Sequence, residues 1–145
     1  MLRLLLIFIL PFFQVAPTWE SNFDVAKQRS IKENKIILIH FVNRGRDTKN
    51  VKLEKEIFES SEFAGYANNH LVLLKIDLGI EQTSSEKQFY HNSIIRERYN
   101  SAAIAPFTII TDSDGKFLKS WNHKQPLNNS DLISAIQTTI EANKQ

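Results

Sequence analysis

The fold is decided by one stretch of the chain, KIILIHFVNRGRDTKNVKLEKEIFESSEFAGYANNHLVLLKID, residues 35–77. It begins with a continuous apolar run at residues 35–42 and ends with another at residues 71–77, as strands buried on both faces require. Between them the apolar spacing becomes helical from Asp47, and a second short helix is predicted from Ser61. A strand, a helical crossover and another strand predict a right-handed βαβ unit with parallel strands.

Helical patterns flank this unit on both sides. Asn22 or Asp24 is the expected cap of a first helix that ends near Glu33. A third helix is predicted behind Ser85, which has Gln88 three residues later and therefore fits a capping box.

The second half of the chain predicts a hairpin and a closing helix. FTIITDSDGKFLKSW, residues 107–121, holds two short strands around an Asp-Gly pair. An amphipathic helix behind Asn129 or Ser130 follows. Because the hairpin strands run antiparallel, the sequence predicts an α/β fold with a mixed four-stranded central sheet and helices on both faces. That is the topology of a thioredoxin-like fold.

The N-terminus is expected to be a secretory signal peptide, residues 1–18. One arginine precedes an uninterrupted apolar run at residues 4–10, and small residues lie ahead of Trp19. The folded domain is then residues 19–145, and a periplasmic or secreted location follows. Pro11 and the short apolar run argue against a stable membrane span after cleavage, although an uncleaved anchor is the alternative.

Composition excludes two classes of function. The chain has 18 basic and 16 acidic residues, a formal charge of +2, which is too balanced for a nucleic-acid partner. It contains no cysteine, so it lacks the thiols for disulfide exchange or a lipid anchor, and its stability must come from core burial.

The sequence also resembles a known family. KLEKEIFESSEFAGYANNHLVLLKID (residues 52–77) and APFTIITDSDGKFL (residues 105–118) are similar to the exported thioredoxin-like proteins common in Bacteroidetes-type bacteria. The resemblance covers nearly the whole chain after the signal peptide. It also implies a cis peptide bond between Ala105 and Pro106.

In that family the helix after the first core strand begins with Cys-x-x-Cys. The resemblance places Asp47, Thr48, Lys49 and Asn50 at this motif, with Arg46 where the family has tryptophan. A carboxylate and an amide cannot exchange disulfides, whereas Asp47 suits a helix N-terminus as a cap. We therefore expect no thiol–disulfide oxidoreductase activity, no catalytic residue and no cofactor.

The leading hypothesis is a redox-inactive module that binds a protein or an extended peptide, with an acidic peptide as the suited class. Basic side chains lie close together in this turn, beside the predicted proline edge. A solvated basic turn is the competing interpretation. The candidate face consists of Arg44, Arg46, Asp47, Thr48, Lys49, Asn50, Ala105 and Pro106.

Two other hypotheses remain open. A non-redox enzyme would draw on His40, Asp47, His70, His91 and His123, but these residues form no recognised catalytic or metal-ligand motif, so no metal site is predicted.

A structural interaction subunit would instead use another surface, with Phe89, Tyr90 and the segment 78–100 as candidates. His40 itself is interpreted as a hydrogen-bonded core residue, and Trp121 and His123 as surface or packing residues.

Overall fold

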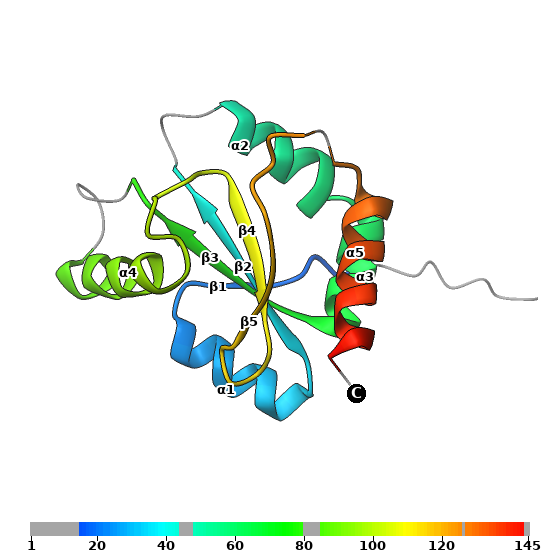
Figure 1. Ribbon diagram of the computed structural model, residues 1–145, viewed down its shortest axis with the longest axis horizontal. Helices are drawn as coiled ribbons and strands as arrows, with labels where there is room; N and C mark the ends of the chain where they lie inside the picture. The colour runs from blue at the N-terminus through cyan, green and yellow to red at the C-terminus, as the bar shows by residue number, and fades with distance from the viewer. Residues whose placement is uncertain (1–14, 44–47, 80–84, 126, 144–145) are drawn as a thin grey trace, which may run out of the picture.

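The computed structural model describes residues 15–43, 48–79, 85–125 and 127–143. Figure 1 shows a central sheet with helices on both faces. None of the helices in these ranges is long and apolar enough to cross a membrane. In chain order the elements are β1 (Trp19–Glu20), α1 (Phe23–Glu33), β2 (Ile36–Val42), α2 (Thr48–Leu53), the π-helix η1 (Glu54–Phe58), α3 (Ser61–His70), β3 (Leu71–Asp77), α4 (Glu86–Tyr99), β4 (Phe107–Thr111), β5 (Phe117–Trp121) and α5 (Asn129–Ala142).

The sheet is mixed, with strand order β1-β3-β2-β4-β5. β2 and β3 run parallel, as the βαβ pattern predicts, and β4 pairs antiparallel with both β2 and β5. The predicted count of four strands was wrong, because β1 adds a fifth. β1 pairs only Trp19 with Leu73 and Glu20 with Leu74, and two residues are too few to show a strand pattern.

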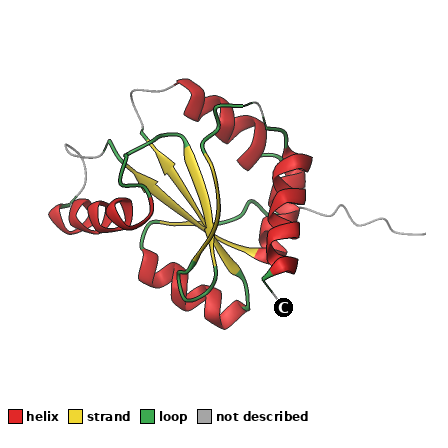
Figure 2. Ribbon diagram, viewed as in Figure 1, coloured by secondary structure: helices red, strands yellow, loops and turns green. Residues whose placement is uncertain are grey.

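Two hydrophobic layers fill the two sides of the sheet. Phe23 and Ala26 of α1 and Ile95 of α4 pack on one face. η1, α3 and α5 cover the other face, and Figure 2 shows α3 and α5 side by side at one flank of the sheet. Because side chains alternate along β2, Leu38 and His40 both point to this second face.

The predicted start of α4 behind Ser85 is confirmed, whereas that of α5 needs correction. The Ser85 hydroxyl accepts a hydrogen bond from the backbone N–H of Gln88 at 3.2 Å, but the Gln88 amide donates to Asn92 at 2.8 Å, so the capping box is only half formed. The cap of α5 is Asn128, one residue before those expected, and its side chain accepts from the backbone N–H of Asp131 at 2.8 Å. Adjacent asparagines with equal capping ability made this choice undecidable from sequence.

Candidate functional site

A row of four side chains crosses the sheet on the face that η1 covers. His40 of β2 lies in register with Lys75 of β3 on one side and with Thr108 of β4 on the other. Thr108 in turn lies in register with Trp121 of β5. We call Lys75, His40, Thr108 and Trp121 the cross-strand row.

The π-helix η1 closes over the centre of the cross-strand row. The Phe58 ring lies 4.6 Å from the His40 ring, centroid to centroid. The Glu54 carboxylate pairs with the Lys75 ammonium at 2.7 Å, and that ammonium lies 4.8 Å from the centre of the Trp19 ring. Single π-helical turns occur often at functional sites. Here the turn seals His40, which has no exposed surface.

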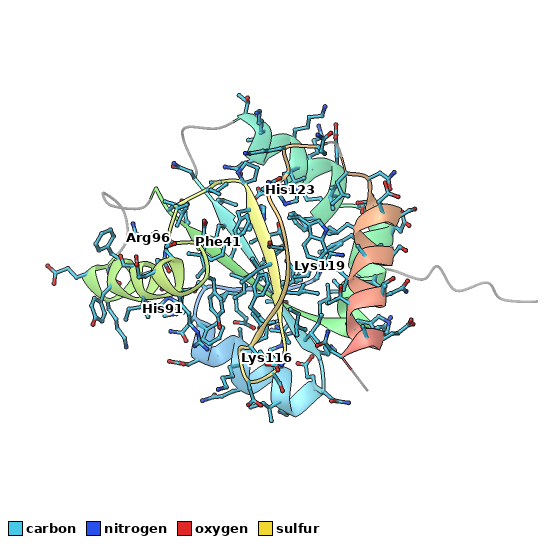
Figure 3. The ribbon with its side chains drawn as sticks, in the orientation of Figure 1. Phe41, His91, Arg96, Lys116, Lys119 and His123 are labelled. Carbon is cyan, nitrogen blue, oxygen red and sulfur yellow. The ribbon has the colours of Figure 1, made fainter. Side chains whose placement is uncertain are left out.

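A chain of hydrogen bonds leads from the buried row towards the surface. His40 Nδ1 lies 2.9 Å from the Thr108 hydroxyl, which lies 2.7 Å from Nε2 of His123. A hydroxyl has one proton, so Thr108 donates to one ring and accepts from the other. His123 follows β5 with a φ of 52°, and Figure 3 shows it near the level of α2. The hydrogen-bond chain therefore starts in the buried row and ends at the half-buried His123.

Burial keeps both histidines of this hydrogen-bond chain, His40 and His123, neutral. Burial lowers the pKa of His40 well below its usual value, and the neighbouring His123 and Lys75 lower it further. Burial also lowers the pKa of His123, to about 4. The interpretation of His40 as a hydrogen-bonded core histidine is confirmed. Thr108 is also fully buried, so neither His40 nor Thr108 is exposed to a substrate.

A groove opens beside His123, between α2 and the segment after β5. Its volume is about 310 Å³. We call it the lysine groove, after the lysines among the residues that define it: Lys49, Lys52, Glu56, Pro106, His123 and Lys124.

The structure brings together part of the face predicted from the sequence. Lys49 and Pro106 line the same groove, and the peptide bond from Ala105 to Pro106 is cis, as the resemblance implied. Thr48 is exposed at the start of α2, whereas Asn50 is only 4% exposed and donates to a backbone carbonyl at 3.4 Å. The other predicted residues, Arg44, Arg46 and Asp47, lie outside the described residues.

The histidines of the enzyme hypothesis do not all converge on one site, because only His40 and His123 meet, at Thr108. His91 accepts a hydrogen bond from the backbone N–H of Phe23 at 2.9 Å, and His70 stacks on the Tyr66 ring at 4.6 Å. Figure 3 shows His91 on α4, away from His123. Within the described ranges, no group of three or more His, Cys, Asp or Glu residues is arranged to hold a metal ion.

The face predicted from the sequence did not include several residues of the lysine groove, among them Lys52, Lys124 and His123. His123 was named only for the enzyme hypothesis and as a surface or packing residue, but it joins the buried row to the lysine groove. Its importance depends on the register that brings Thr108 next to the end of β5, and no local motif signals that contact.

Comparisons with known proteins agree on the fold. No family model matches the chain. The chain is 24% identical over 123 residues to the disulfide bond reductase DsbH of Chlamydia pneumoniae. The aligned region covers 85% of this chain and 72% of that relative. A solved structure of a DsbH oxidoreductase matches with a TM-score of 0.81 at 22% identity, over 96% of this chain and 94% of that one. A thioredoxin from Thermus thermophilus matches with a TM-score of 0.65 at 7% identity, over 87% and 88% of the two chains.

These likenesses agree with the mixed sheet and flanking helices of the thioredoxin-like fold. The relatives' names describe thiol chemistry, for which this chain has no cysteine. The protein therefore has the thioredoxin-like fold and lacks the Cys-x-x-Cys motif.

Proposed function

We propose that this protein is a redox-inactive binding module that holds an extended acidic peptide in the lysine groove. The observation that carries this proposal is the meeting of three lysines from two segments around Pro106. Thiol exchange needs a thiolate to attack and a second thiol to resolve the mixed disulfide, and the chain has neither. Binding is the property of this face that does not depend on thiols.

The charge of the lysine groove favours an anionic ligand. Lys49 and Lys52 come from α2 and Lys124 from the segment after β5, whereas Glu56 is the one acidic residue among the described residues that line the groove. Glu56 and Lys52 are 3.9 Å apart and both largely exposed, so this ion pair is weak. A carboxylate of a ligand can therefore compete for the lysine.

The backbone beside the groove suits an extended peptide. The ladder between β2 and β4 ends at the pair Phe41 and Phe107, so Ala105 and Pro106 lie beyond it. Peptides commonly bind by adding main-chain hydrogen bonds at such an edge, with side-chain pockets providing specificity. We propose that Arg44 and Arg46 extend the positive charge along the same peptide.

The test is fluorescence anisotropy with labelled decapeptides that are acidic, neutral or basic and otherwise matched. We expect the acidic peptide to bind, with a Kd that rises with salt concentration. The variant Lys49→Ala/Lys52→Ala/Lys124→Ala should lose this binding. The matched control removes three lysines of α1 and α4, Lys27→Ala/Lys32→Ala/Lys87→Ala, and should bind as the wild type does.

Equal binding of all three peptides, or equal loss in both triple variants, would contradict the proposal, because net charge alone would then explain the result. A separate variant, Arg44→Ala/Arg46→Ala, tests whether the arginines belong to the site.

We also place the protein in the cell envelope or outside the cell, on the basis of the expected signal peptide at residues 1–18. N-terminal sequencing of protein recovered from the envelope fraction tests this location. A start near Trp19 is expected, and a start at Met1 in the cytosolic fraction contradicts it.

A second candidate function is an interaction subunit that uses α4. Phe89, Tyr90 and Ile94 are 46%, 68% and 48% exposed on this helix. Exposed apolar side chains in a group favour a protein contact. Affinity capture from envelope extract separates the two candidates. If α4 is the binding surface, Tyr90→Ser/Ile94→Ser should lose the captured partner. If the lysine groove is the binding surface, the triple lysine variant should lose it instead.

A further inference from the structure

A second hollow adjoins the lysine groove and differs from it in chemistry. Its volume is about 330 Å³, and it shares His123, Gln125 and Leu127 with the groove. Its other walls include three apolar residues, Ile104, Phe107 and Trp121. We call it the tryptophan pocket. The shared wall makes the two hollows neighbours. Both have apolar lining residues, but among the described residues the lysines lie only in the lysine groove and the phenylalanine and tryptophan side chains only in the tryptophan pocket, beside Ser120 and Asn122.

The walls of the tryptophan pocket are held in place before any ligand binds. Asn100 bonds both the N–H and the carbonyl of Ile104, at 3.0 and 2.7 Å. Trp121 lies in register with Thr108, and the Thr108 hydroxyl holds His123 at 2.7 Å. A preformed site loses less entropy when it binds a ligand.

The size of the pocket limits what it can hold. Small-molecule sites are roughly 300–1,000 Å³, so a hollow of about 330 Å³ fits one large side chain better than a whole cofactor. Aromatic and aliphatic walls favour an apolar side chain.

The charge around the pocket decides which molecule brings that side chain. The stretch KFLKSWNHKQPL, residues 116–127, contains three lysines and no acidic residue. A second copy docking through the same edge would bring like charges together, at a cost in free energy. An acidic peptide is attracted instead.

We propose that the tryptophan pocket binds an aromatic or branched aliphatic side chain of the same peptide whose acidic residues occupy the lysine groove. The inference rests on the proposed function and adds its specificity. The ligand is an extended segment in which one large apolar residue lies within a few residues of an acidic pair. His123 forms the wall between the two subsites.

The test compares labelled decapeptides of equal net charge. One carries an Asp-Glu pair among glycine and serine residues, and the others add a phenylalanine or leucine at varied separations from the pair. We expect the best apolar peptide to bind roughly tenfold more tightly than the acid-only peptide. Trp121→Ala should remove this gain and leave the affinity for the acid-only peptide unchanged.

A second variant keeps the test valid if Trp121→Ala fails to fold. Ile104 is 38% exposed, so Ile104→Asp disturbs the pocket without emptying the core, and it should also remove the gain. Ile31→Asp, at a 58% exposed position on α1, is the matched control and should keep it.

Two results would overturn the inference. If no apolar peptide binds more tightly than the acid-only peptide, or if the gain survives both pocket variants, the tryptophan pocket is not a subsite and the acidic-peptide function stands. If no peptide binds at all, the proposed function and the inference both fail.

Discussion

The buried histidines predict that this protein loses stability in mild acid. The pKa of His123 is lowered from its usual 6.5 to about 4, and that of His40 is lowered well below 6.5. The unfolded chain therefore binds more protons than the folded one between these values. The stabilising effect is fully present above about pH 6.5 and is lost as the pH falls towards the folded-state pKa values.

The magnitude follows from the number of protons. One proton taken up on unfolding changes the free energy of unfolding by ~1.4 kcal/mol per pH unit, so a histidine kept neutral down to about pH 5 contributes ~2 kcal/mol. His123 is half-buried, and solvent screening reduces its share to ~1 kcal/mol. His40 is completely buried and adds a loss in the same direction. The expected loss between about pH 7.5 and pH 5 is therefore at least ~1 kcal/mol, a measurable part of a typical stability of ~5–15 kcal/mol.

The ion pairs of Lys75 and of Glu33 are not expected to produce this signal in the same range. Lys75 faces His40 and is balanced by Glu54 at 2.7 Å. The pKa of Glu33 is lowered to about 2, first by the hydrogen bond from Arg29 and then by that from Lys35, so this carboxylate stays ionised throughout.

Urea unfolding followed by tryptophan fluorescence measures the effect. The variant His40→Gln/His123→Gln keeps side-chain hydrogen-bonding groups next to Thr108 but does not titrate, so its stability should be nearly constant over the same pH range. His70→Gln replaces an exposed histidine and should leave the wild-type loss intact. The reasoning is refuted if the wild type shows no loss, or if the double variant shows the same loss.

Four further results are expected. Phe63→Ala removes a fully buried ring that packs at 5.0 Å on Phe58, and should lower the urea-derived free energy of unfolding by ~3–5 kcal/mol, whereas a cost below ~1 kcal/mol would contradict the packing. Gly115→Ala should lower Tm, with a cost of ~1–3 kcal/mol, because φ is 84° and the new Cβ would lie 2.9 Å from the Tyr99 hydroxyl; an unchanged Tm would be the contrary result. Asn22→Ala should cost ~1 kcal/mol in urea unfolding, because its side chain accepts the first backbone N–H groups of α1, and Asn22→Asp should retain most of the stability. The pure protein should not reduce insulin disulfides, and reduction above the buffer rate with metals and carrier thiols absent would disprove the redox-inactive assignment.

The sequence predicted the centre of the fold well because its signals are local and strong. The apolar runs ending at Val42 and at Asp77 are strands β2 and β3, with the first strand starting one residue later than predicted. Burial on both faces leaves a continuous hydrophobic run that no surface helix would show.

The features that the sequence did not predict depend on long-range pairing or on subtle geometry. β1 exists because Trp19 and Glu20 add to the edge of β3, and two residues carry no periodicity. The residues of η1 have an ordinary helical pattern, and nothing in their spacing distinguishes a π-helix from an α-helix.

The candidate site was predicted in part for the same reason. The cis proline and Lys49 could be placed from the resemblance and from helix position, and they lie in one groove. The contribution of His123 depends on Thr108 and on the turn after β5, which lie far from α2 in sequence.

The distribution of charge supports the proposal that a thiol-free site on this fold binds an anionic ligand. Beneath the groove, Lys75 is balanced by Glu54, and the two linked histidines are neutral because they are buried. The interior therefore adds little net charge to the field in the groove. The positive potential at the rim comes instead from lysines such as Lys124, whose position is fixed by the turn at His123. Because His40 and Thr108 hold that turn by hydrogen bonds that end at His123, the buried hydrogen-bond chain positions the groove without competing for the proposed ligand.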